Sequence, residues 1–237
     1  MSPDQSPDQS SHPANMARRP LETRKAAWPR RLASRLITFG LTPNQVSVLS
    51  ICFAALSAAA FAGTIARQGA SQAFFFVLAA TGIQLRLLCN LLDGLMAVEG
   101  GMRTKAGDLY NDLPDRISDS LILIAAGYAV PPNVWGMVLS GPLLGWAAAL
   151  LAALTAYIRL LGAAAGTTQY FIGPMAKQQR MGLLTAACLL AAAEPWFMVR
   201  YHTGAKVLAV AMLLIVVGSV ITCIRRLARI TADLKSS

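Results

Sequence analysis

Long apolar runs separated by short polar segments occupy the chain from about residue 45 onward. A transmembrane helix requires about 20 predominantly apolar residues. Six runs approach or exceed this length, near residues 45–64, 72–92, 113–130, 137–162, 181–199 and 205–224. The pattern therefore predicts an all-α integral membrane protein, with six transmembrane helices in one compact domain.

The segment before the first apolar run, residues 28–40, shows a helical period of its own. Its apolar face consists of Trp28, Leu32, Leu36 and Phe39. Arginines lie off this face, Pro29 suits a first helical turn, and Gly40 suits a helix end. These features predict an interfacial amphipathic helix that precedes the six spans.

The two ends of the chain are polar and basic. Residues 1–27 contain SPDQ twice together with Ser, Pro and Asn, and they are predicted to form a disordered basic tail. The tail is not expected to be a signal peptide, because the first apolar run begins only near residue 45 and is long enough to span. We therefore expect a membrane domain over residues 28–224 and a basic cytoplasmic tail over residues 225–237.

Composition and charge placement restrict the class of partner. The chain is 55% hydrophobic and 14% charged, whereas soluble domains contain about 25% charged residues. Its net charge of +10 comes largely from basic residues before the first span and after the last. The positive-inside rule then places both termini and the loops at 93–112 and 163–180 in the cytoplasm. Membrane lipids are the expected partners of these basic residues, and no nucleic-acid partner is predicted.

An acidic stretch between the second and third spans carries the candidate chemistry. Of the eleven acidic residues, six lie here: Asp93, Glu99, Asp108, Asp112, Asp115 and Asp119. A carboxylate at the edge of a bilayer is costly unless it is paired, hydrated or bound to a cation. Hard oxygen ligands favour Mg²⁺, Mn²⁺ or Ca²⁺. The stretch therefore predicts a metal site at the membrane surface; the alternative is a solvated acidic loop.

The spacing of these residues supports convergence on one pocket. Asn90 and Asp93 are three positions apart, and Asn111, Asp115 and Asp119 follow at intervals of four, so each set shares one helix face. The glycines predicted to interrupt the region between the two helices are Gly94, Gly100, Gly101 and Gly107. Two helix ends joined by a glycine-rich turn would bring both sets together.

Several further polar residues are candidates for the same site. Arg86 lies inside the second span and needs a partner, which is a carboxylate of the site, a bound phosphate or a purely structural ion pair. Lys177 and Arg180 open the fifth span, and Arg159 ends the fourth. They suit a phosphate-binding role, although membrane topology alone also explains them. Asn44 lies at the membrane entry of the first span.

The acidic stretch resembles the signature of the CDP-alcohol phosphatidyltransferase family, D-x2-D-G-x2-A-R followed by G-x3-D-x3-D. The aligned residues are Asn90, Asp93, Gly94, Ala97, Val98, Gly107, Asn111 and Asp115. Asparagine thus stands at the first and third aspartate positions, and valine replaces the arginine. The segments LTPNQVS at 41–47 and DRISD at 115–119 are also similar to the family.

The resemblance implies a six-helix protein of a bacterial-type inner or cell membrane, usually a homodimer, with its active site facing the cytoplasm. Such enzymes move a phosphatidyl or other substituted phosphate group from a CDP-linked lipid donor, such as CDP-diacylglycerol, to an alcohol acceptor and release CMP. The resemblance implies Mg²⁺ or Mn²⁺ at Asn90, Asp93, Asn111 and Asp115, with Asp115 as the catalytic base. The expected substrate-binding residues are Gly94, Ala97, Gly107, Asn44, Lys177 and Arg180.

The departures from the signature leave other functions open. Asparagine offers an oxygen to a metal but no charge, and Asp108, Asp112 or Asp119 could compensate. Arg103, Lys105 or Arg86 could substitute for the arginine lost at Val98. One alternative is an inactive relative that binds a CDP-lipid as a membrane scaffold. Another is a cation-coupled transporter. The acceptor alcohol is not identified by the sequence.

Overall fold

The computed structural model describes residues 26–102, 107–131, 140–197 and 203–236, so most of the predicted N-terminal tail lies outside the described residues. The described residues form seven α-helices. They are α1 (Ala27–Thr38), α2 (Pro43–Ile65), α3 (Gly69–Glu99), α4 (Gly107–Tyr128), α5 (Gly141–Ala164), α6 (Lys177–Phe197) and α7 (Thr203–Ser236). The predicted all-α class is confirmed.

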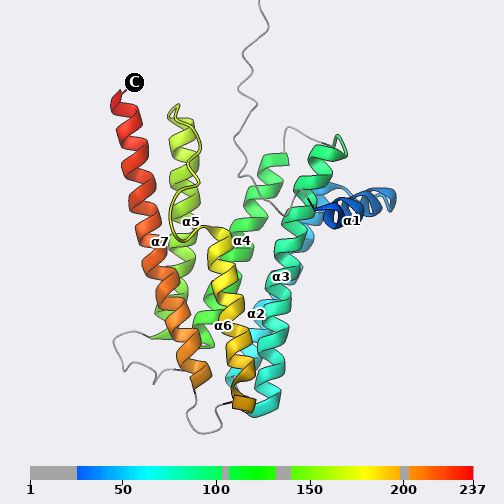
Figure 1. Cartoon of the computed structure of the whole chain (residues 1–237), viewed down its shortest axis with the longest axis vertical. Coiled ribbons are helices and arrows are strands. Elements are labelled where there is room, and N and C mark those ends of the chain that lie inside the picture. Colours follow the sequence, from blue (N-terminus) through cyan, green and yellow to red (C-terminus); the bar gives the residue numbers. More distant parts are fainter. Residues whose placement is uncertain (1–25, 103–106, 132–139, 198–202, 237) are drawn as a thin grey trace, which may run out of the picture.

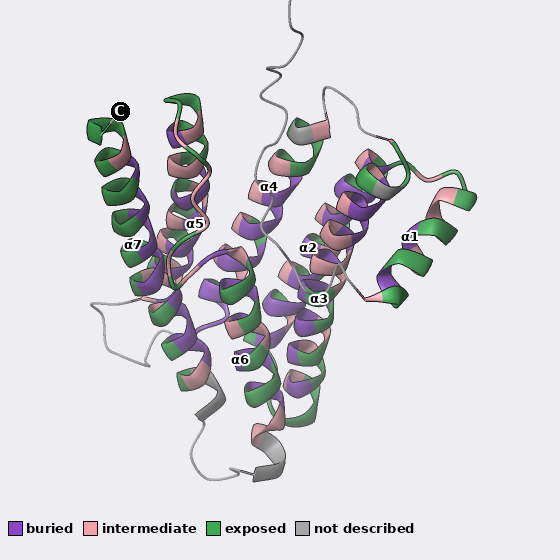
Figure 2. Ribbon diagram, turned by 45° about the horizontal axis from the view of Figure 1, so that its top comes forward, coloured by how far each residue is buried: buried purple, intermediate pink, exposed green. Residues whose placement is uncertain are grey.

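Six long helices stand side by side, and α1 lies across them near the end where α7 finishes (Figure 1). We refer to this as the C-terminal end of the bundle. Contacts between neighbours close a ring in the order α2, α3, α6, α7, α5, α4 and back to α2. Buried residues face the inside of this ring and exposed residues face outward (Figure 2).

Four of the helices, α2, α3, α5 and α7, are long and apolar enough to cross a membrane. The chain therefore has the helices of an integral membrane protein. α4 and α6 are not among these four: α4 carries Asp112, Asp115, Arg116 and Asp119, and α6 carries Lys177, Arg180 and Glu194. The expectation of six membrane-spanning helices stays a prediction for these two.

The helices in the acidic region are longer than expected. α3 continues through Gly94 and ends only at Glu99, so Gly94 does not interrupt it; Gly101 follows with a positive φ of 64°. α4 begins at Gly107 and includes Pro114, the expected point of a helix start or bend. α7 also continues to Ser236, through most of the segment expected to be a tail. Packing against neighbouring helices outweighs the free-energy cost of placing Gly94 and Pro114 inside a helix, which is about 1 kcal/mol for a glycine.

The amphipathic segment forms α1, but its apolar face divides in two. Leu32 and Leu36 pack with α3 in a small hydrophobic cluster that contains Leu92. Trp28 and Phe39 instead remain 56% and 82% exposed. The helix therefore rests on the bundle with one side and offers aromatic side chains on the other, a placement that suits the interface of a bilayer.

The start of α2 is fixed by a capping box. The Thr42 hydroxyl accepts a hydrogen bond from the Gln45 backbone N–H at 3.3 Å. In return, the Gln45 side-chain oxygen accepts one from the Thr42 backbone N–H at 2.9 Å. Pro43 occupies the first turn, where its missing N–H costs nothing. This arrangement confirms the helix restart expected at Pro43 and sets the register of α2 beside the acidic region.

Glycines allow α4 and α5 to approach closely. A Cβ atom added at Gly127 would lie 2.5 Å from the Cα of Gly145. A Cβ atom added at Gly141 would lie 2.4 Å from the carbonyl oxygen of Gly127. Small residues at such crossings let helix backbones pack tightly within a membrane.

We expect Gly127→Ala to lower the free energy of unfolding by about 1–3 kcal/mol, because the new methyl group meets backbone atoms that can move only with their helix. Thermal unfolding in detergent micelles measures the change. Gly182→Ala on α6 is the matched control, since its methyl group would meet no atom within 4 Å. Equal stability of the two variants would contradict the close packing of α4 and α5.

Candidate functional site

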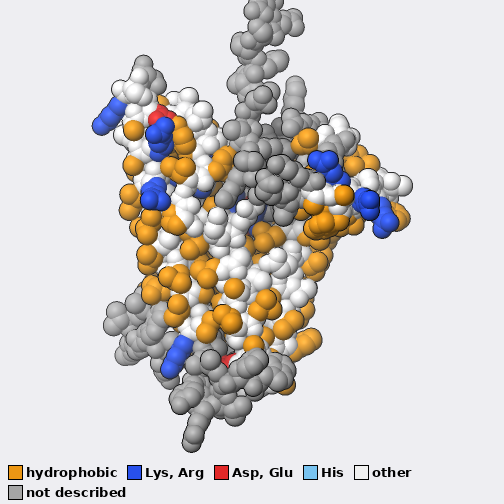
Figure 3. Space-filling view, in the orientation of Figure 1, with side chains coloured by type: hydrophobic (Ala, Val, Ile, Leu, Met, Phe, Trp, Pro, Cys, Tyr) orange, Lys and Arg blue, Asp and Glu red, His pale blue; other side chains and the backbone are white. Residues whose placement is uncertain are grey.

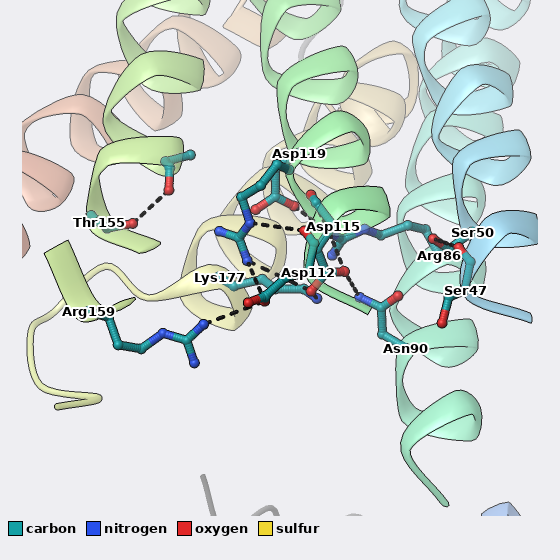
Figure 4. A network of polar contacts seen from close by, with 12 residues as sticks. Ser47, Ser50, Arg86, Asn90, Asp112, Asp115, Asp119, Thr155, Arg159 and Lys177 are labelled. Atoms are coloured by element: carbon teal, nitrogen blue, oxygen red, sulfur yellow. Dashed lines mark hydrogen bonds and ion pairs between the residues drawn. The ribbon is translucent and has the colours of Figure 1, made fainter. Parts of the chain in front are cut away.

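Charged side chains from four helices meet inside the bundle, toward its C-terminal end (Figure 4). We call this group the polar centre. It consists of Ser47, Arg86, Asn90, Asp93, Asp112, Asp115, Arg116, Asp119, Arg159, Lys177 and Arg180. The carboxylates come from α3 and α4, and the cations from α3, α4, α5 and α6.

Asp115 is the point where three helices meet. Its buried carboxylate accepts hydrogen bonds from the Asn90 amide on α3 and from the Lys177 ammonium on α6. The Arg86 guanidinium adds a bond of 3.2 Å from α3, and the Arg116 guanidinium lies 3.8 Å away on α4. The structure therefore brings together three of the predicted site residues, Asn90, Asp115 and Lys177.

Arg86 and Asp119 form the deepest part of the polar centre. Arg86 is fully buried, and its Nη2 lies 2.7 Å from Asp119 Oδ1. Arg180 Nη2 approaches the other Asp119 oxygen at 3.3 Å, while its Nη1 donates to the Met175 carbonyl at 2.9 Å. The partners of Arg86 are therefore carboxylates, one of the alternatives left open by the sequence.

Asp93 lies at the edge of the centre and has a different environment. Its Oδ2 accepts a 2.5 Å hydrogen bond from the Ser47 hydroxyl on α2. Its Oδ1 is buried and has no hydrogen-bond partner among the described residues. The charges of Asp115 and Lys177 lie close enough to interact electrostatically with the Asp93 carboxylate. Sequence reasoning missed Ser47, although it lies in the LTPNQVS segment that is similar to the family.

The outer part of the centre is tied to the segment between α5 and α6. Figure 1 shows this return segment, residues 165–176, running back along the bundle before α6 begins. Arg159 lies 3.5 Å from Asp112, donates to Gln169 at 3.2 Å and stacks on the Phe171 ring at 5.2 Å.

Residues of α7 hold the return segment from the other side. Arg226 donates to the Ile172 carbonyl at 3.0 Å, and the Thr222 hydroxyl accepts from the Met175 amide at the same distance. The segment thereby lets α6 start deep in the bundle. Lys177, the first residue of α6, consequently reaches Asp115.

The remaining predicted residues make no described side-chain contact with this centre. Asn111 is exposed in the early turns of α4, and Gly107 is the first residue of that helix. Gly94 and Ala97 are half-buried on α3, and Asn44 is half-buried at the start of α2. The side chain of Asp108, together with Arg103 and Lys105, lies outside the described residues.

The donor set does not match a site for two divalent cations. Within the described part of the chain, no group of three or more His, Cys, Asp or Glu side chains is placed to hold a metal ion. The charged side chains of the polar centre comprise four carboxylates and five cations. The unpartnered Oδ1 of Asp93, with an amide at Asn90 one helical turn away, fits one cation.

Comparison with solved structures identifies similar folds. The Mycobacterium tuberculosis phosphatidylinositol phosphate synthase PgsA1 with CDP-DAG bound superposes with a TM-score of 0.65 at 23% identity, covering 86% of this chain and 94% of that chain. The same synthase in complex with manganese and citrate gives 0.63 at 23% identity, covering 85% and 88%. No family model and no curated protein matches the chain. The likeness at this identity establishes a shared fold.

We expect Arg86→Met to lower the free energy of unfolding by about 3–5 kcal/mol, because it leaves the buried carboxylates of Asp115 and Asp119 without their shared partner. Thermal unfolding in detergent tests this. Arg35→Met, at an exposed position of α1, is the matched control and should have little effect. Adding Asp119→Asn to Arg86→Met should recover part of the loss; strictly additive losses would show that the two side chains do not interact.

Proposed function

We propose that the protein is a membrane phosphotransferase of phospholipid biosynthesis. It transfers a phosphatidyl or other substituted phosphate group from a CDP-linked donor, such as CDP-diacylglycerol, to an alcohol and releases CMP. The observation that carries this proposal is the meeting of Asn90 and Asp115, two positions of the family signature, with Lys177 from a third helix. The fold shared with a synthase whose structure contains CDP-DAG supports it.

We place the polar centre on the cytoplasmic side of the membrane. On the face shown in Figure 3, Lys and Arg side chains gather mainly around the C-terminal end of the bundle, with an apolar band below them. The positive-inside rule assigns such an end to the cytoplasm. In this arrangement α4 and α6 also cross the bilayer, because each packs between two neighbours of the ring. We further propose that the enzyme acts as a homodimer.

The proposed reaction is an exchange of phosphate esters. The acceptor hydroxyl oxygen bonds to the phosphorus that carries the lipid group, and the bond from that phosphorus to the bridging oxygen breaks, so that CMP leaves. The hydroxyl proton passes to the carboxylate of Asp115. Lys177 presents positive charge to the phosphates, where negative charge grows during transfer, and Arg180 adds its charge from the deeper part of the centre.

The divalent cation and the nucleotide occupy the adjoining surface of α3 in this proposal. Asp93 and Asn90 would hold Mg²⁺ or Mn²⁺, which neutralises phosphate charge when bound. Asn111 of the signature lies on the exposed side of α4 and faces the incoming donor. The proposed substrate-binding residues are Asn44, Gly94, Ala97, Gly107, Lys177 and Arg180. Gly94 and Gly107 permit a close approach of the backbone to the nucleotide.

A second candidate is a CDP-lipid-binding scaffold without turnover. The contacts of Asp115 favour it, because the carboxylate already accepts from Lys177, Asn90 and Arg86, and an acceptor hydroxyl would have to compete with these donors. The two candidates share a ligand and differ in the release of CMP.

We expect purified protein to release CMP from CDP-diacylglycerol when a suitable alcohol and Mg²⁺ or Mn²⁺ are present. Asp115→Asn should reduce the rate by about 100-fold or more, because it removes the proton acceptor. Asp93→Ala should raise the metal concentration needed for half-maximal rate. CMP is measured by chromatography across a panel of alcohols that includes glycerol phosphate, inositol phosphate and serine.

Glu194→Gln is the matched control, since it removes a carboxylate about 25 Å along α6 from Lys177. It should leave the rate unchanged. Binding of CDP-diacylglycerol without CMP release, for every alcohol, would select the scaffold. Absence of both binding and release would reject the two candidates together.

A further inference from the structure

We propose that Lys177 takes the place of a divalent cation at Asp115, so that the polar centre binds one divalent cation, at Asp93, rather than two. The inference rests on the proposed function for the identity of the phosphate ligand. Its basis is the distribution of donors and charges in this chain, which differs between Asp115 and Asp93.

Protein groups already occupy three acceptor positions of the Asp115 carboxylate. One oxygen accepts from Asn90 and from Arg86, and the other accepts from Lys177. All three contacts are made by N–H donors that a metal ion would have to displace. A divalent cation in the same place would also meet the positive charges of Lys177 and Arg86 at close range, and like charges repel strongly in a poorly solvated interior.

The ion pair with Asp115 stabilises Lys177 in its position, whereas the dipole of its own helix does not. Lys177 is the first residue of α6. A positive charge at a helix N-terminus opposes the helix dipole, at a cost of about 0.3–1 kcal/mol. The ion pair with Asp115 offsets this cost, and the return segment held by Thr222 and Arg226 delivers the residue to that point.

The two asparagines remove the negative charge that a second metal would need. Asparagine at 90 and 111 leaves Asp93 and Asp115 as the charged members of the four signature positions. Five cations already face four carboxylates in the polar centre. Two divalent ions would add four positive charges to a group that already has a positive excess, whereas a single one is balanced by a bound diphosphate.

Asp93 has the opposite character. Its side-chain hydrogen-bond donor is the neutral Ser47 hydroxyl, and its buried Oδ1 keeps an unused acceptor position. A buried carboxylate oxygen without a partner is costly, and a cation bound there removes that cost. The centre therefore combines one exchangeable cation at Asp93 with one tethered cation at Asp115.

The test is the stoichiometry of Mn²⁺ binding, measured from the electron paramagnetic resonance signal of free Mn²⁺ with purified full-length protein, with and without CDP. We expect one Mn²⁺ per chain. Lys177→Met should add a second binding event or increase Mn²⁺ affinity by about tenfold or more, because it exposes Asp115 and removes a repelling charge. Lys177→Arg should behave as the unaltered protein, and Lys206→Met, an exposed lysine of α7, serves as the matched control.

Two Mn²⁺ ions of similar affinity in the unaltered protein would overturn the inference, and this measurement needs no variant. An unchanged stoichiometry and affinity in Lys177→Met would also overturn it. If Lys177→Met fails to fold, Asn90→Asp with Asn111→Asp supplies the comparison: restoring both charges should raise the number bound above one. Two ions together with CMP release would reject this inference alone, whereas one ion without CDP binding or CMP release would reject the proposed function alone.

Discussion

The Arg86 guanidinium, placed between Asp115 and Asp119, sets the arrangement of the bundle interior. A fully buried charge is tolerated only when its partners are close and well oriented, and here both partners come from α4. These ion pairs fix the register of α3 against α4. The two helices touch each other little and each packs mainly against α2. Arg180 adds α6 to the same carboxylate of Asp119, so that one group of ion pairs aligns three helices.

This alignment leaves the polar centre ordered in two layers. The deep layer, with Arg86, Asp119 and Arg180, is buried and held by ion pairs among its own side chains. The outer layer holds half-buried side chains such as Lys177, Arg159 and Asp112, which keep access to the C-terminal end of the bundle. Rigid inner ion pairs that support a more accessible outer set are a common way to hold reactive groups in place before a ligand arrives.

Much of this organisation follows from local sequence patterns. Apolar runs predict the helical membrane class, and the spacing of Asn90 and Asp115 predicts their convergence. Other features depend on tertiary packing and could not be predicted locally. Lys177 meets Asp115 across 62 positions of sequence because the return segment lowers the start of α6. Gly94 and Pro114 remain within helices because neighbouring helices support them, and Trp28 and Phe39 separate from Leu32 and Leu36 because α1 rests on α3.

The order of helices around the ring has a consequence for biogenesis. α2, α3 and α4 form one side of the ring, α5, α6 and α7 form the other, and the two sides meet along α3–α6 and α4–α5. Because synthesis proceeds from the N-terminus, Arg86 is available to neutralise Asp115 and Asp119 before Lys177 and Arg180 have been translated. The first half of the chain can thus enter the membrane with Asp115 and Asp119 already paired, and the centre is completed only when the second half docks.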